Sequence, residues 1–106
     1  MANHKLVDIA SVIRSKNSGP YELTFDVIFK DFETYGMVKA ANAINKQNFC
    51  ALYGIEESDV LHLVYFDPAK AVKVTICRPI PSGALGETDV YGAQQHAPLM
   101  GMEVEF

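Results

Sequence analysis

The sequence predicts an α+β domain in which helices cover one face of a mostly antiparallel sheet. Residues 21–29 alternate apolar and polar side chains strictly, which is typical of a half-buried antiparallel strand. Residues 31–53 carry apolar side chains at helical spacing. Residues 60–66 and 71–76 have strand patterns and are separated by a short turn containing Pro68, so they are expected to form a hairpin.

The first half of the chain is predicted to contain two strands and two helices. Residues 5–13 mix apolar and polar side chains and are expected to form the first strand. Residues 14–20 hold Asn, Ser, Gly and Pro, which together mark a loop. An Asn-rich stretch divides the helical segment in two, with Asn45 as the N-cap of the second helix and Gly54 at its end.

The second half is predicted to contain three strands. Residues 60–66 are almost entirely apolar, which indicates a strand covered on both faces at the centre of the sheet. A short helix is expected from about residue 88 to 95, and residues 99–106 alternate as a terminal strand. This order of elements, with a sheet of about five strands, fits a ferredoxin-like sandwich with one additional strand.

Length and composition exclude several classes of protein. The 106 residues form one domain, with 49% hydrophobic and 21% charged residues, as in an ordinary globular protein. A net charge of −4 without a basic stripe argues against nucleic acid as a partner. No apolar run approaches the roughly 18 residues of a membrane span, and no signal-peptide core is visible, so we expect a cytoplasmic protein. Cys50 and Cys77 stand in apolar contexts and are expected to be buried free thiols.

A polar segment between the first two strands is one candidate binding site. Residues 14–19 place two cations, two hydroxyl groups and an amide beside a glycine that permits close backbone approach. Such a segment can hold a carboxylate or phosphate, and the groups we predict to do so are Arg14, Ser15, Lys16 and Asn17. The spacing is not that of a P-loop, so nucleotide hydrolysis is not indicated. The alternative is a solvated polar loop without a ligand.

The long polar stretch at residues 78–96 is the second candidate, because long loops in compact domains are usually functional or disordered. Arg78 is an anion ligand by its chemistry. His96 is the histidine best suited to acid–base work, with a structural or exposed role as the alternative. The stretch supplies the predicted substrate-binding residues Arg78, Ser82, Gly83 and Gln95, and the predicted catalytic residues Asp89, Tyr91 and His96.

The remaining histidines and the carboxylates carry weaker signals. His4 lies near the end of the chain, and His62 lies in an apolar strand, where a core or interface histidine is expected in preference to a catalyst. No two His or Cys residues stand at the spacing of a zinc site. A carboxylate site built from Glu87 and Asp89 is conceivable, but we expect no metal site, and the sequence names no cofactor.

Three long motifs carry a resemblance to a known family. They are DIASVIRSKNSGP at 8–20 followed by ELTFD at 22–26, LHLVYFDP at 61–68, and RPIPSG at 78–83 continued by GETDVYGAQQHAP at 86–98. The chain resembles short, uncharacterised bacterial proteins encoded beside AtuA-like proteins, a name that refers to acyclic terpene utilisation. The resemblance covers nearly the whole chain.

The chain is also similar to the small C-terminal domain of fused AtuA-like proteins. In those, an RSGDKG loop follows the first strand and a GALG turn precedes the last one. This chain has residues 14–19 and 83–86 at the matching places, and it departs from the fused form in the acidic-basic core of the loop. The resemblance implies a ferredoxin-like fold, a larger partner subunit, and a role in catabolism of organic acids or their coenzyme A thioesters.

Two interpretations of the function follow. In the first, the chain is a small subunit or accessory domain of a lyase or hydro-lyase with an AtuA-like large subunit. The cations of the two candidate segments would hold a substrate carboxylate or phosphate, and Asp89, Tyr91 and His96 would orient it or move protons. In the second, the chain is a non-catalytic self-assembling module that binds a small acidic ligand. A stand-alone enzyme is not favoured, because no nucleophile or metal set is recognisable.

Overall fold

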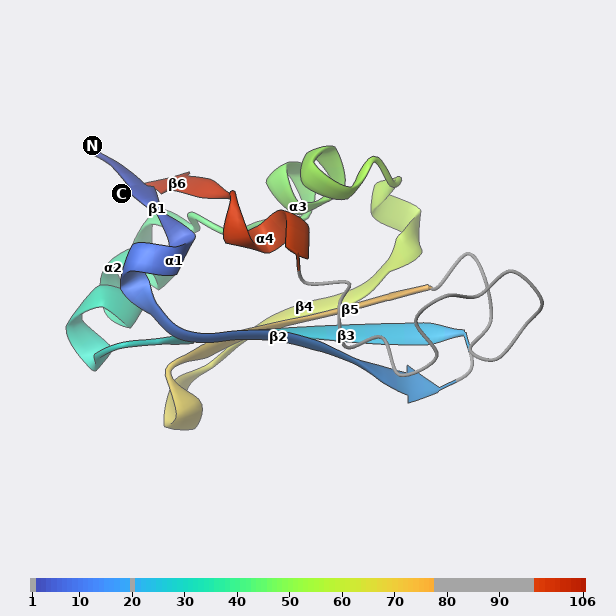
Figure 1. The fold of residues 1–106 in the computed structure, drawn as a ribbon, viewed down its shortest axis with the longest axis horizontal. Helices are drawn as coiled ribbons and strands as arrows, with labels where there is room; N and C mark the ends of the chain where they lie inside the picture. The colour runs from blue at the N-terminus through green and yellow to red at the C-terminus, as the bar shows by residue number, and fades with distance from the viewer. Residues whose placement is uncertain (1, 20, 78–96) are drawn as a thin grey trace.

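The computed structural model describes residues 2–19, 21–77 and 97–106, and Figure 1 shows their arrangement. In chain order the elements are β1 (Asn3–Lys5), α1 (Leu6–Ile9), β2 (Ala10–Gly19), β3 (Glu22–Phe29), α2 (Phe32–Ala41), α3 (Lys46–Tyr53), the 3₁₀ turn η1 (Glu57–Asp59), β4 (Val60–Phe66), the 3₁₀ turn η2 (Asp67–Ala69), β5 (Ala71–Cys77), α4 (Ala97–Met100) and β6 (Glu103–Glu105).

Two antiparallel sheets organise these elements. The larger sheet has the strand order β2-β3-β5-β4, and the smaller one pairs β1 with β6. Helices α1 to α4 and the small sheet all lie on one side of the larger sheet (Figure 1). The predicted α+β class is therefore confirmed, with an antiparallel sheet and helices on one face, and the architecture is consistent with a ferredoxin-like fold.

The hydrophobic core lies between the larger sheet and its cover of helices. Phe25 of β3 contacts Phe49 and Tyr53 of α3, with ring centroids 5.2 Å and 4.9 Å apart. Each fully buried side chain of this size contributes about 1.5–3 kcal/mol relative to exposure. The largest fully buried apolar side chains come from both layers: Phe25, Phe29, Phe49, Leu6, Ile44, Leu99, Val38 and Val72.

The helix boundaries follow from local capping chemistry. The side chain of Asn45 accepts a hydrogen bond from the backbone N–H of Asn48, and the side chain of Asn48 accepts one from the backbone N–H of Asn45. This capping box satisfies N–H groups that the helix itself leaves without partners. Gly54 ends α3 in the left-handed region, at φ 66°. The predicted start and end of the second helix are both confirmed.

A polar contact fastens α2 to the turn between β4 and β5. The hydroxyl of the buried Tyr35 donates to Asp67 Oδ1, and Lys39 Nζ donates to the same oxygen at 2.8 Å. Burial, and then the hydrogen bond to Asp67, raise the pKa of Tyr35 to about 12. The hydrogen bonds from Lys39 and Tyr35 lower the pKa of Asp67. The contact favours a neutral phenol beside an ionised carboxylate.

The N-terminal part differs from the prediction in two places. Residues 6–9, expected in a strand, form the short helix α1, and residues 14–19, expected in a loop, are the second half of β2. This half pairs with β3 as far as Gly19, opposite Glu22. Asn and Ser disfavour strands only modestly, and a full ladder with a neighbouring strand outweighs that preference.

Strand β4 lies at an edge of the sheet and not at its centre. It pairs with β5 alone among the described strands. Helices cover only one side of this strand, and Leu61, Val64 and Phe66 are all exposed. His62 is also exposed, which corrects its expected place inside a buried strand. An unbroken apolar pattern resembles that of a strand covered on both faces, whether or not a second cover is present.

The C-terminal segment and the cysteines each differ in part from the sequence prediction. The segment expected as a strand at 99–106 contains the end of α4 followed by β6, which pairs with β1 in the small sheet. Both cysteines are free, but Cys77 is exposed and only Cys50 is buried. Burial raises the pKa of the Cys50 thiol, with smaller contributions from Glu57 and Asp59.

The helix expected at 88–95 lies outside the described residues. Within the ranges described, no helix is long and apolar enough to cross a membrane.

Candidate functional site

The larger sheet has a covered face, which packs against the helices, and an open face on its other side. Leu23, Phe25, Val27 and Phe29 are buried on the covered face, so the alternate residues of β3 belong to the open face. Directly paired residues of neighbouring strands share a face. The strand registers thus define the open face as Val12, Arg14 and Lys16 of β2, Glu22, Thr24, Asp26 and Ile28 of β3, Ala71, Lys73, Thr75 and Cys77 of β5, and His62, Val64 and Phe66 of β4.

A carboxylate lies buried in the middle of this face. Asp26 is only 2% exposed, and its Oδ2 accepts a hydrogen bond from Arg14 Nε at 3.0 Å. Its second oxygen, Oδ1, is buried and accepts no hydrogen bond from any described residue. Lys73 stands directly opposite Asp26 on β5. A buried carboxylate is costly unless it is paired, so the ion pair with Arg14 offsets the negative charge of Asp26.

A hollow of about 440 Å³ lies on the open face beside this ion pair. Its floor includes the hydroxyl groups of Thr24 and Thr75, whose oxygen atoms are 3.1 Å apart in a hydrogen bond. The hollow is lined by residues of all four strands: Lys16, Ser18, Glu22, Thr24, His62, Val64, Phe66, Lys73 and Thr75. It is thus built on strands, which hold side chains more rigidly than loops do.

The hollow combines a basic part with an apolar part. The basic part contains Lys16, Lys73 and the imidazole of His62. The apolar part is formed by Val64 and Phe66, and Lys73 Nζ lies 5.4 Å from the centroid of the Phe66 ring. Neither lysine is in an ion pair with a carboxylate of the described residues. Two unpaired ammonium groups attract an anion, and the adjacent apolar surface suits a ligand with a hydrocarbon part.

The structure separates the residues of the first predicted site. Arg14 and Lys16 lie on the open face, where Lys16 lines the hollow and Arg14 is 56% exposed at its side chain and paired with Asp26. Ser15 and Asn17 point to the other side of β2, because successive strand residues alternate. Ser15 is buried. The predicted cluster of four therefore contributes two residues to the open face.

The second predicted site lies outside the described residues. Its members are Arg78, Ser82, Gly83, Asp89, Tyr91, Gln95 and His96. Their assignments as substrate-binding and catalytic residues stay predictions. Glu87 and Asp89, considered above as a carboxylate metal site, also lie outside the described residues. Among the residues that the structure describes, no group of three or more His, Cys, Asp or Glu residues is placed to hold a metal ion.

Sequence reasoning missed His62, Lys73, Thr24 and Thr75 as members of a site. The signal was present in the alternation of residues 71–76, which places Lys73 and Thr75 on one face of a strand. The alternation predicts the strands, but it does not by itself show that their polar residues meet in one site. His62 was missed because its strand was expected at the buried centre of the sheet.

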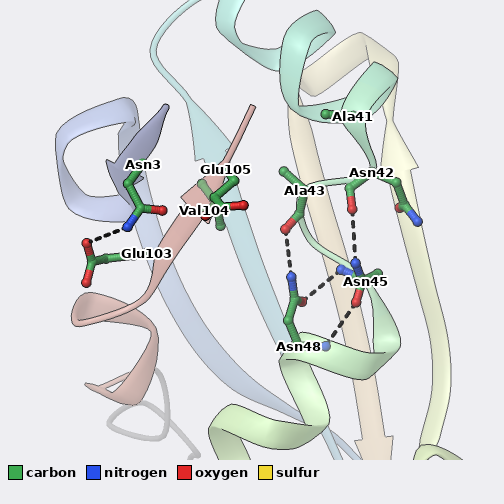
Figure 2. Close-up of a pocket in the computed structure, with 9 residues that line it drawn as sticks. All are labelled: Asn3, Ala41, Asn42, Ala43, Asn45, Asn48, Glu103, Val104 and Glu105. Atoms are coloured by element: carbon green, nitrogen blue, oxygen red, sulfur yellow. Dashed lines mark hydrogen bonds between the residues drawn. The ribbon is translucent and has the colours of Figure 1, made fainter. Parts of the chain in front are cut away.

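A second hollow, of about 480 Å³, lies between the small sheet and the junction of α2 with α3. Figure 2 shows the amide side chains of Asn3, Asn45 and Asn48 engaged in hydrogen bonds. Asn48 Nδ2 donates to the carbonyl of Ala43 at 2.7 Å, and Asn45 Nδ2 donates to the carbonyl of Asn42 at 3.0 Å. Because these amides hold the helix junction in shape, we assign this hollow a structural role.

The fold and the open face together define a small α+β domain that presents a basic hollow on an antiparallel sheet. The chain belongs to the family described as "Domain of unknown function (DUF4387)", whose family model matches residues 6–103. A search of the curated proteins found no match, and a search of the solved structures found none either.

Proposed function

We propose that this protein is a small subunit or accessory domain of a two-component enzyme, and that its open face helps to bind the substrate, an organic acid or its coenzyme A thioester. The observation that carries the proposal is the hollow, in which Lys16, His62 and Lys73 stand beside Val64 and Phe66. A carboxylate or phosphate suits the cations, and the carbon chain of an acid suits the apolar part.

The surroundings of the hollow support an anionic ligand in particular. The whole chain carries a net charge of −4, yet the described open face holds three cations, Arg14, Lys16 and Lys73. Its carboxylates are Asp26, which is engaged with Arg14, and Glu22 at one end. An acidic protein that gathers lysines around one hollow concentrates positive potential there, which raises the local concentration of an anion.

The hollow lies on a face that the described elements leave uncovered, and this supports the role of a subunit. No described element covers the open face (Figure 1). Enzymes exclude water from the reacting centre, and the described residues alone do not close this face. A larger subunit seated on it would complete the site. The resemblance to proteins encoded beside AtuA-like proteins supports an AtuA-like large subunit, with a lyase or hydro-lyase reaction on the acid. In such a reaction His62 would donate a hydrogen bond or move a proton.

A second candidate function is a non-catalytic self-assembling module that binds a small acidic ligand. The exposed apolar residues of the edge strand β4 favour it, because they offer a surface for association without a large subunit. The two candidates differ in what accompanies the protein in the cell: an obligate larger protein in the first, and further copies of this chain in the second.

The test is a tagged pull-down from the native host, followed by an activity assay of whatever complex is recovered. We expect a stoichiometric AtuA-like protein and turnover of an organic acid or its thioester. The double variant Lys16→Gln/Lys73→Gln should then lower kcat/KM at least tenfold, while Lys46→Gln on the exposed surface of α3 leaves it unchanged. Recovery of the chain alone, or a complex indifferent to the double variant, would refute the proposed role.

A further inference from the structure

The two outer strands of the larger sheet differ in how their edges are protected. Natural proteins guard exposed edges with charged residues, proline or bulges. Strand β2 carries Arg14 and Lys16 and has register irregularities near both of its ends. Strand β4 reads Val-Leu-His-Leu-Val-Tyr-Phe, without Lys, Arg, Asp, Glu, Pro or Gly, and its one irregularity lies at its start, between Val60 and His62. Among the described residues, nothing pairs with the outer edge of β4, which is therefore available for pairing along most of its length.

The side chains of β4 also suit burial better than exposure. Leu61, Val64 and Phe66 are exposed among the described residues, and Val64 is 46% exposed. Three exposed apolar side chains gathered on one unprotected edge strand suit an interaction surface. Pairing through the edge would satisfy its outward backbone N–H and C=O groups, and cross-strand neighbours of the second copy would pack beside these side chains.

The charges at the two ends of β4 indicate what pairs with it. Glu56, Glu57 and Asp59 immediately precede the strand. At its other end, Lys70 follows η2, and Lys39 of α2 lies 2.8 Å from Asp67. The strand is thus acidic where it begins, while at its other end Lys39 and Asp67 neutralise each other and Lys70 is the remaining cation. A second β4 paired antiparallel with the first brings the acidic end of each copy beside the lysine-bearing end of the other. Because the pairing is two-fold symmetric, this favourable contact forms at both ends.

We propose that two copies of this chain pair antiparallel through β4, about a two-fold axis at Leu63, and join their larger sheets into one. In this register His62 of one copy lies opposite Val64 of the other, on the open face. Both residues line the basic hollow, so each copy completes the rim of its neighbour's hollow. The pairing does not depend on the proposed function, because a dimer of this kind can act alone or within a larger complex.

Light scattering coupled to size exclusion on the full chain tests the pairing. We expect a particle of twice the 11.7 kDa chain mass that dissociates only on dilution. Val64→Lys places two like charges across the axis and should weaken association at least about 100-fold. The matched control is Val12→Lys, since Val12 is 38% exposed on the same face but at the β2 edge. It should leave the dimer intact, and circular dichroism should confirm that both variants are folded.

Disulfide trapping tests the register independently. His62→Cys/Val64→Cys, in a Cys77→Ser background that removes the exposed native thiol, should form a covalent dimer on oxidation, because directly paired positions bring side chains within disulfide reach. The single variant Val12→Cys in the same background should not. A wild-type chain that stays monomeric at all concentrations, a dimer that Val64→Lys leaves unchanged, or a dimer that Val12→Lys breaks would each overturn the proposal.

Discussion

The covered and open faces of the larger sheet come from the same strands and serve different purposes. On β3, Leu23, Phe25 and Val27 are buried against the helices, while Thr24 and Asp26 between them face the other way. The covered face carries the hydrophobic burial that stabilises the fold. The open face carries cations, hydroxyl groups and one buried carboxylate. Stability and binding can therefore be changed separately by substituting neighbouring residues of one strand.

The largest expected effect is on the covered face. Phe25→Ala should lower the free energy of unfolding by about 3–5 kcal/mol, because it removes a fully buried ring and leaves a cavity beside Phe49 and Tyr53. Thr24→Ala, one residue away on the open face, should cost about 0.5–1.5 kcal/mol through loss of its hydrogen bond with Thr75. Urea denaturation measures both. Equal losses would contradict the division between the two faces.

The ion pair in the middle of the open face should have the next largest effect. Arg14→Ala should destabilise the fold by about 1–3 kcal/mol, since it removes the described hydrogen-bond donor of a buried carboxylate. The same substitution in an Asp26→Asn background should cost clearly less, because no buried negative charge is left behind. A double-mutant cycle by chemical denaturation gives the coupling. If the two substitutions are simply additive, Arg14 does not stabilise the fold through Asp26.

Alkaline pH should lower the stability of the fold in part through deprotonation of Tyr35. The pKa of Tyr35 is raised from 10.0 to about 12, so the folded state holds this proton more tightly than the unfolded state. The stability that this phenol contributes is present below pH 10 and is lost as the pH rises from 10 to about 12. Thermal unfolding across that window should show a smaller drop for Tyr35→Phe than for the wild type. An identical drop would mean that Tyr35 does not contribute.

The smallest effect on stability is expected from the lysines of the hollow. Lys16→Gln and Lys73→Gln should each change the free energy of unfolding by no more than about 0.5 kcal/mol, because both side chains are exposed. Their effect should be confined to anion binding. A loss of several kcal/mol by denaturation would show that these lysines stabilise the fold, which would contradict their assignment to a binding surface.

The features predicted correctly from the sequence depend on neighbouring residues. The start of α3 at Asn45 and its end at Gly54 follow from caps that act within one turn. The alternation at 21–29 defines β3 because its period is local as well. The edge position of β4 could not be predicted, since an apolar strand has the same pattern whether or not a neighbour and a second cover are present.

Only part of the candidate site could be predicted, because the rest depends on side-chain direction and on strand pairing. Arg14 and Lys16 were identified by chemistry, but Ser15 and Asn17 were grouped with them because a loop places no restriction on direction. Once the segment is a strand, its period of two sends alternate residues to opposite faces. Lys73 and His62 join Lys16 only through the pairing of four strands, which residue spacing along the chain does not reveal.

The most direct test of the central claim is a titration of the ¹⁵N-labelled protein with acetyl-CoA and, separately, with succinate, followed by amide chemical shifts. The claim is that the open face binds an organic anion. We expect the largest shifts at Lys16, Thr24, Lys73 and Thr75, and we expect them to vanish in Lys16→Gln/Lys73→Gln but to persist in Lys46→Gln. Shifts centred on the α2–α3 side, or no difference between the two variants, would contradict the claim.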